Sequence, residues 1–265
     1  MKVKANGIMM HYETEGSGDN LVLFHALGQN LNMWYHQVPV FSKTYRVIAY
    51  DIRGAGETED HHTEYSVSLL IEDAYEFLKV LGIREGFLVG CAAGGAIAMG
   101  LTLNYPDMVK GVVLAGSGGG FPTQSSEPAE RRKALSDLLA QRDIKRIAEF
   151  ITTGSFSVDF KSKKPNEFDK VTRIICQNKP EGIARLIRAF HVWEGHPDFS
   201  EVKCPVLLIV GEEDTFVGVQ QARRVERAIP NSELIILPGG RIVPIETPGG
   251  FNQAVLRFLS EIRAK

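Results

Sequence analysis

The sequence contains few cysteines and no excess of charge of one sign. Cys91, Cys176 and Cys204 are its three cysteines, widely spaced and without a C-x-x-C pair. This pattern excludes a disulfide framework and a zinc site, and it predicts a reducing compartment, the cytoplasm. Lys and Arg total 30 against 32 Asp and Glu, a formal charge of −2. The balance argues against nucleic acid or an anionic membrane surface as a partner.

Long hydrophobic runs and cofactor motifs are also absent. The most apolar stretch, residues 87–103, contains four glycines, and the N-terminus has no apolar signal core, so we predict no membrane segment. Gly118-Gly119-Gly120 is not followed by Lys-Ser/Thr, and no glycine group has the dinucleotide-loop spacing. We therefore predict no cofactor and no metal.

Apolar runs alternating with helical patterns dominate the rest of the chain. A hairpin is predicted across Asn6-Gly7. Buried strands are predicted over residues 20–25, 46–51, 87–89, 111–116, 205–211 and 232–237, and helices over 70–81, 219–229 and 251–262. Such alternation favours an α/β domain with a mostly parallel sheet and helices on both faces.

Residues 127–189 break this alternation, because they are charge-dense and helical in propensity with no clear strand. We predict an inserted helical cap over residues 121–200, within a core of residues 1–120 and 201–265. The charged residues of 131–145 are expected to form the solvated face of the cap.

The stretch from Phe87 to Met99 contains Gly90, Gly94 and Gly95 between a buried strand and an Ala-rich helix. This is the spacing of the G-x-S-x-G nucleophile elbow, where a serine is exposed on a strained strand-to-helix turn. The outer residues must be glycine because a side chain there would collide with the neighbouring strand and helix. Here the central residue is Ala92.

Four segments in order make the chain resemble the α/β-hydrolase fold family over essentially its whole length, near the small esterases and cofactor-free haloperoxidases. They are residues 21–28 (similar to the His-Gly oxyanion loop), 51–56 (D-x-R-G-x-G), 208–214 (the strand end that supplies the acid) and 240–248 (the segment that normally begins Gly-His). The resemblance implies the α/β-hydrolase fold, with a pocket between core and cap.

In that family a serine attacks the carbonyl, a histidine accepts its proton, and a carboxylate orients the histidine. These positions correspond here to Ala92, Arg241 and Asp214. Alanine offers no nucleophile, and arginine stays protonated and cannot act as a base. Efficient serine hydrolysis is therefore excluded, and we expect Arg241 to form an ion pair with Asp214.

The resemblance also implies an oxyanion hole made of the backbone N–H groups of Leu27 and Ala93. Neither donor needs a particular side chain, so weak residual hydrolysis is allowed, since such a hole with substrate binding retains roughly 10³–10⁴-fold catalysis over water.

Five further residues are candidates for the pocket: His25, Ala55, Cys91, His191 and Gly218. His25 is interpreted as structural, because the corresponding loop histidine of the family usually forms hydrogen bonds to the backbone. Cys91 is also interpreted as structural, because the residue before the central residue of the elbow points into the packing behind the turn. His191, which with His196 flanks Trp193, is the best remaining candidate for acid–base work, although ordinary polar cap residues are the simpler interpretation.

Three functions stay open. The first is an esterase-type scaffold that binds a small ester or apolar carbonyl compound and hydrolyses it weakly or not at all. The second is a different enzyme that uses Arg241 as an anchor for an anionic substrate. The third is a non-catalytic small-molecule-binding protein.

Unusual residues gather at the site while the scaffold matches well, so we hypothesise that the site was altered by evolution or by design. The sequence leaves the oligomeric state open.

Overall fold

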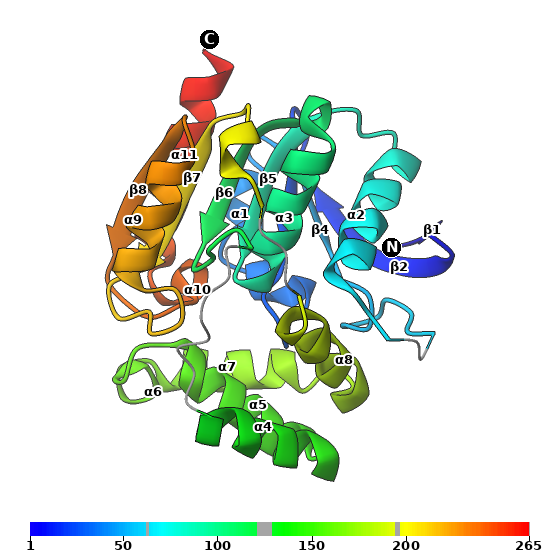
Figure 1. Ribbon diagram of the computed structural model, residues 1–265, viewed down its shortest axis with the longest axis vertical. Coiled ribbons are helices and arrows are strands. Elements are labelled where there is room, and N and C mark those ends of the chain that lie inside the picture. The colour runs from blue at the N-terminus through cyan, green and yellow to red at the C-terminus, as the bar shows by residue number, and fades with distance from the viewer. Residues whose placement is uncertain (62–63, 121–128, 194–196, 265) are drawn as a thin grey trace.

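The computed structural model describes residues 1–61, 64–120, 129–193 and 197–264. Within them an eight-stranded sheet has the order β1-β2-β4-β3-β5-β6-β7-β8 (Figure 1). Its strands are β1 (Lys2–Ala5), β2 (Ile8–Glu15), β3 (Asn20–Phe24), β4 (Arg46–Tyr50), β5 (Gly86–Cys91), β6 (Val109–Ala115), β7 (Val206–Gly211) and β8 (Ser232–Leu237). The predicted strands are thus confirmed.

The first two strands are the antiparallel part of the sheet. β1 pairs with β2, and β2 with β4, in antiparallel register, whereas all pairs from β4 through β8 are parallel. The β1–β2 turn places Asn6 at φ 43° and Gly7 at φ 81°, the positive values that a two-residue hairpin requires. The hairpin prediction is therefore confirmed.

Helices cover both faces of the sheet. Short α1 (Val38–Phe41) and C-terminal α11 (Pro248–Arg263) pack with one apolar cluster, and α2 (Val67–Val80), α3 (Ala93–Asn104) and α9 (Gly218–Ala228) with the other. Ser66 caps α2 by accepting the N–H of Leu69 at 3.1 Å, and Gly82 ends it at φ 70°. The predicted α/β class is confirmed.

Several short helical segments were not predicted: η1 (Leu31–Trp34), η2 (Pro106–Met108), η3 (Phe199–Glu201), α1 and α10 (Val243–Glu246). Each is three or four residues long, too short to show a helical period in the sequence. None of the helices in the described parts of the chain is long and apolar enough to cross a membrane.

Five helices between β6 and β7 form a separate layer below the sheet in Figure 1, and we call them the cap helices. They are α4 (Ala129–Gln141), α5 (Ile144–Ser155), α6 (Phe160–Lys163), α7 (Pro165–Ile175) and α8 (Pro180–His191). Leu138 is the buried residue of α4, whose other side chains are exposed or half-buried. Residues 121–128 and 194–196, at the ends of the predicted cap, lie outside the described residues.

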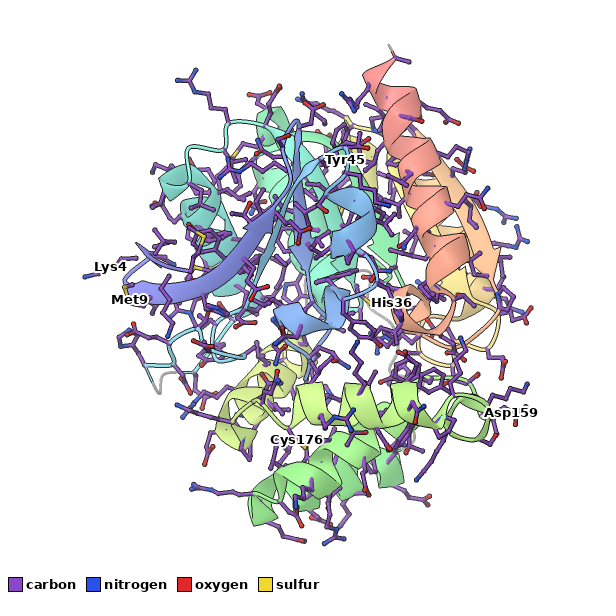
Figure 2. The ribbon with its side chains drawn as sticks, turned by 180° about the vertical axis from the view of Figure 1, so that it is seen from behind. Lys4, Met9, His36, Tyr45, Asp159 and Cys176 are labelled. Atoms are coloured by element: carbon purple, nitrogen blue, oxygen red, sulfur yellow. The ribbon has the colours of Figure 1, made fainter. Side chains whose placement is uncertain are left out.

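The cap helices contact the core through the loops that follow its central strands. A Cβ atom on Gly28, just after β3, would lie 3.0 Å from Cδ1 of Ile151 in α5. Figure 2 shows His36 at the boundary between the core and the cap helices, and its Nε2 atom is 3.4 Å from Glu167 of α7. Residues near the carboxyl ends of the strands therefore face the cap.

Candidate functional site

The turn between β5 and α3 holds Ala92 in an unusual backbone conformation. Ala92 has φ 50° and ψ −114°, and its N–H donates to the carbonyl of Ala115 at 2.8 Å. Positive φ is uncommon for a residue with a Cβ atom and costs free energy. The residue is 6% exposed, so its methyl group lies at a nearly closed surface.

Close packing around this turn explains its glycines. A Cβ atom on Gly90 would lie 2.5 Å from the carbonyl oxygen of Gly94, and one on Gly94 would lie 2.2 Å from the carbonyl oxygen of Phe24. One on Gly95 would lie 2.4 Å from Oγ of Ser117. These separations are shorter than van der Waals contact, so the collisions expected from the sequence are present.

His25 holds the loop after β3 in place. Its Nδ1–H donates to the carbonyl of Ala26 at 2.9 Å, and its Nε2 accepts the N–H of Ile52 at 2.9 Å. The ring is fully buried, and this burial lowers the pKa of His25, so the neutral ring that these two bonds require is favoured. The structural interpretation of His25 is confirmed.

The backbone N–H groups of Leu27 and Ala93 have no acceptor among the described residues. Both residues are half-buried, and they follow the carboxyl ends of the adjacent strands β3 and β5. Two unpaired donors at neighbouring strand ends are the feature that an oxyanion hole needs.

Asp214, on the loop after β7, presents one oxygen that has a partner and one that has none. Oδ1 accepts the N–H groups of Phe216 at 2.8 Å and Val217 at 3.1 Å. Oδ2 is buried, and it has no hydrogen-bond partner among the described residues. Burial raises the pKa of Asp214, and the positive charge of Arg241 and the two backbone donors oppose that rise.

Arg241 does not pair with Asp214, so the predicted ion pair is wrong. Its Nε–H donates to the carbonyl of Gly116 at 3.2 Å, and its guanidinium lies 4.6 Å from the centre of the Phe216 ring. Neither Arg241 nor Asp214 forms a salt bridge with any described residue. The carbonyl and the aromatic face are the partners of this cation, and Oδ1 of the carboxylate is already satisfied by backbone.

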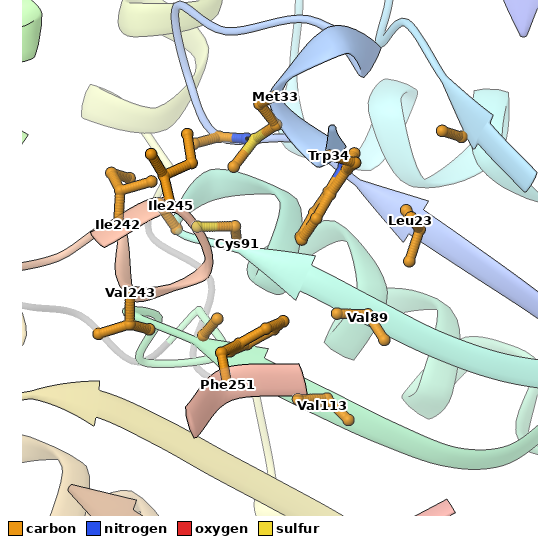
Figure 3. Packing of buried hydrophobic residues seen from close by; sticks show 14 of the residues in the cluster. Leu23, Met33, Trp34, Val89, Cys91, Val113, Ile242, Val243, Ile245 and Phe251 are labelled. Atoms are coloured by element: carbon orange, nitrogen blue, oxygen red, sulfur yellow. Dashed lines mark hydrogen bonds between the residues drawn. The ribbon is translucent and has the colours of Figure 1, made fainter. Parts of the chain in front are cut away.

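Cys91 is buried and packed beside the turn. Figure 3 shows it in the same apolar layer as Met33 and Ile245, and its exposed fraction is 0%. Burial raises the pKa of Cys91 to about 12. The thiol is therefore un-ionised at neutral pH, and the prediction of an inert cysteine is confirmed.

The other pocket candidates lie in different surroundings. Ala55 is buried in the apolar cluster that packs against α2 and α3, whereas Ala92 belongs to the opposite cluster. Gly218 is half-buried at the start of α9 with φ 66°. His191 is exposed at the end of α8 and lines a hollow formed by cap helices alone, without any of the core candidates. His196 lies outside the described residues.

Glu246 links the cap to the turn that contains Arg241. This residue was not identified from the sequence. Its carboxylate accepts the N–H of Gly240 at 2.8 Å, the N–H of Ser157 at 3.2 Å and the hydroxyl of Ser157. The carbonyl of Ser155, at the end of α5, accepts the N–H of Arg241 at 3.0 Å. A glutamate in an otherwise apolar segment, residues 242–246, was the available signal.

Among the described residues, no group of three or more His, Cys, Asp or Glu side chains could hold a metal ion. The site instead combines the strained turn at Ala92, the two free backbone donors, the buried Oδ2 of Asp214 and the guanidinium of Arg241.

Residues 19–248 match the sequence model of a family described as alpha/beta hydrolase fold. The chain belongs to this family.

Two relatives within the family are similar over nearly their whole lengths. A 3-oxoadipate enol-lactonase 2 from Acinetobacter baylyi is 27% identical, over 95% of this chain and 93% of its own. A 2-hydroxy-6-oxo-6-(2'-aminophenyl)hexa-2,4-dienoic acid hydrolase from Metapseudomonas resinovorans is 27% identical, over 97% of this chain and 90% of its own.

Solved structures share the fold of this α/β hydrolase. The enol-lactonase from Burkholderia xenovorans LB400 superposes with a TM-score of 0.89 at 24% identity, covering 98% of this chain and 100% of that one. A bromoperoxidase from Bacillus anthracis gives the same TM-score, identity and coverage. At this identity the superpositions bear on the fold alone.

Proposed function

We propose that the protein is an esterase-type α/β hydrolase whose triad positions are Ala92, Arg241 and Asp214, and that it hydrolyses esters weakly or not at all. The observation that carries the proposal is the backbone of Ala92, which keeps a strained φ of 50° between β5 and α3 while presenting only a methyl group. In a serine hydrolase that strain exposes a nucleophile, and here no nucleophile gains from it.

Asp214 and Arg241 support the same assignment. The unpaired Oδ2 of Asp214 is the acceptor that a histidine N–H would occupy in a working triad. Arg241 stands where that histidine is expected, but a guanidinium cannot accept a proton near neutral pH. The substitution, by evolution or by design, therefore removes the base and leaves its partner unsatisfied.

We further propose that the ligand is a small ester or apolar carbonyl compound bound between the core and a cap that comprises α4 to α8. The hydrogen bond from Nδ2 of Asn178, between α7 and α8, to the carbonyl of Gly28 at 2.8 Å supports this location, because it brings the cap against the loop that carries the free N–H of Leu27. The names of the two relatives describe an enol-lactone and an oxo acid, which are both carbonyl compounds. Three free thiols, Cys91, Cys176 and Cys204, support a reducing compartment.

One observation favours the second candidate, an enzyme or binding protein that holds an anionic ligand through Arg241. Only Nε of this guanidinium has an acceptor among the described residues, so its Nη atoms remain available to bind a carboxylate. The names of both relatives include a carboxylic acid. Binding of a ligand carboxylate by Arg241 would act together with the backbone donors of Leu27 and Ala93 and would not replace them.

The double variant Ala92→Ser, Arg241→His tests the first proposal. We expect it to gain hydrolysis of short p-nitrophenyl esters by at least about 10²-fold over the parent protein, because both missing groups return beside a free Asp214 oxygen. Initial rates and labelling by a fluorophosphonate measure the gain, and the parent should show no labelling.

Each single variant and the triple variant with Asp214→Asn are the controls. Members of a triad act as a unit, so each control should stay near the parent rate. A double variant that folds and is not labelled would contradict the proposal. Rapid hydrolysis by the parent protein would contradict it as well.

A further inference from the structure

A hollow of about 770 Å³ lies between α4 and α8 on the cap, outside the candidate site. This volume falls in the range of about 300–1,000 Å³ that small-molecule sites occupy. It is lined by Arg132, Lys133, Leu135, Ser136, Leu139, Ala140 and Arg142 from α4 and its end, and by Pro180, Glu181, Ala184, Arg185, Ile187, Arg188 and His191 from α8.

Charge is distributed unevenly along this hollow. Arg142, just after α4, pairs with Glu181 in the first turn of α8 at 3.1 Å, so the two helices run antiparallel and one end of the hollow is neutralised. The other end is bounded by the beginning of α4 and the end of α8. It carries the basic side chains Arg132, Lys133, Arg188 and His191, and no acidic residue lines it in the described part of the chain.

Lys133 and Arg188 at this end are available to a ligand. Lys133 pairs with Asp137 at 2.7 Å and Arg188 with Glu64 at 3.2 Å, but all four side chains are more than half exposed. Exposed ion pairs contribute little to stability, so a ligand anion can replace Asp137 and Glu64 as the partner of these two cations with little loss of free energy. Arg185 is different, because it is bonded to Asp60 and both side chains are largely buried.

The middle of the hollow is apolar. Leu135 and Leu139 are half-buried, Ala184 is half-buried, and Ile187 is 9% exposed. These side chains lie in a recess and do not project, so they suit an enclosed chain better than a flat membrane surface. Between residues 133 and 141 the α4 axis rises about 12 Å, the scale of a medium-length alkyl chain.

We propose that this hollow, which we call the α4–α8 groove, binds a single-chain amphiphile with an anionic head. The head lies against Lys133, Arg188 and His191, and the alkyl chain lies over Leu135, Leu139 and Ile187. Carboxylate and phosphate heads share the chemistry that Lys133 and Arg188 recognise. The groove is separate from the Ala92 turn, so the inference does not depend on the proposed function.

Calorimetric titration with decanoate and with decyl phosphate, each below its micelle concentration, tests the proposal. Both are expected to bind the parent protein, and neutral decanol is expected to bind at least about tenfold more weakly, because it lacks the charge-assisted hydrogen bonds. The double variant Lys133→Gln, Arg188→Gln should lose about tenfold or more in affinity for both anions by the same reasoning. Comparison of the two heads shows which anion the groove prefers.

Two variants separate the groove from general effects. Ala184→Phe fills the recess without changing charge and should abolish binding. Arg257→Gln removes an exposed cation of α11 in the core, where it pairs with Glu233, and it should leave the affinity unchanged. Circular dichroism checks that each variant is folded.

Three results would overturn the proposal. The first is equal affinity for decanol and decanoate. The second is binding to anionic phospholipid vesicles without binding to monomeric amphiphile, which would indicate a membrane surface as the occupant. The third is loss of decanoate binding in Arg241→Gln while the Lys133→Gln, Arg188→Gln variant still binds, which would place the ligand at the core site and leave the test of hydrolysis unaffected.

Discussion

Ala92 keeps a backbone conformation that costs free energy although its methyl group carries out no chemistry. We therefore expect Ala92→Gly to stabilise the protein. Relief of the positive-φ strain is worth about 1–3 kcal/mol, and the extra freedom of glycine in the unfolded chain offsets about 0.5–1 kcal/mol of it. The net gain of about 1 kcal/mol corresponds to about 2–4 °C in Tm, which calorimetry can measure.

Ala96→Gly is the matched control, because Ala96 lies four residues further along in α3 at the same exposed fraction of 6%. There the backbone is helical, so glycine should cost about 1 kcal/mol. A loss of stability in both variants would show that the turn at Ala92 is not strained.

At the residue scale the sequence was enough to place Ala92, Asp214 and Arg241 in the loops after β5, β7 and β8, but not to predict their contacts. Glycine spacing and strand order determine where such positions come in the chain. The partner of Arg241 depends on whether a carbonyl and an aromatic ring lie within reach, and Gly116 and Phe216 are 125 and 25 residues away in sequence. Charge complementarity alone therefore predicted the wrong partner.

Among the elements, the turn between α7 and α8 fixes the cap to two loops of the core. Nδ2 of Asn178 donates to the carbonyls of Gly28 at 2.8 Å and Ile175 at 3.1 Å, and its Oδ1 accepts the N–H of Gly56 at 2.6 Å. The side chain is 5% exposed, so its removal leaves buried partners unsatisfied. We expect Asn178→Ala to lower the free energy of unfolding by about 3 kcal/mol, which urea unfolding can measure.

The neighbouring Gln177 supplies the comparison. It is exposed, and its Oε1 accepts from Asn30 at 2.9 Å and Asn32 at 3.0 Å. Gln177→Ala should change the free energy of unfolding by less than about 1 kcal/mol, because water replaces it. Equal costs for the two variants would argue against Asn178 as a buried link between cap and core.

Helical periodicity predicted that the cap is helical but not how its helices pack. An apolar stripe shows that a helix buries one face, and it does not show against which neighbour. His191 illustrates this limit, because α8 places it toward α4 and the outer groove. Spacing alone did not decide between acid–base work at the core site and the simpler role of an ordinary polar cap residue.

For the whole molecule, buried thiols predict a loss of stability at alkaline pH. Burial raises the pKa of Cys91 to about 12 and that of Cys204 to about 11, from an ordinary value of 9.0. Below pH 9 both folded and unfolded thiols are neutral. Above pH 9 only the unfolded chain releases these protons, so each thiol lowers the free energy of unfolding by about 1.4 kcal/mol per pH unit. The loss from Cys204 ends near pH 11 and that from Cys91 near pH 12.

Urea unfolding between pH 8 and pH 11 measures this slope. The double variant Cys91→Ala, Cys204→Ala should show a flatter profile than the parent, whereas Cys176→Ala, which removes a half-buried thiol, should change it less. Parallel profiles for parent and double variant would contradict the assignment of the alkaline loss to these thiols.

The architecture as a whole was predictable because the central strands are largely apolar runs and the turns at Asn6-Gly7 and around Ala92 contain glycine. Those signals are local and survive low sequence identity. The pairing of distant loops with the cap, as in Glu246 with Ser157, is not local, and only the folded structure shows it.

The bonds of Ser155 and Ser157 to the segment from Gly240 to Glu246 have a consequence for exchanging parts between relatives. The carbonyl of Ser155 accepts the N–H of Arg241, and Glu246 joins Ser157 to Gly240, so the backbone of that segment is anchored on the end of α5. A chimaera carrying a foreign cap would therefore inherit a misplaced position 241 unless the graft also brought the α5–α6 corner.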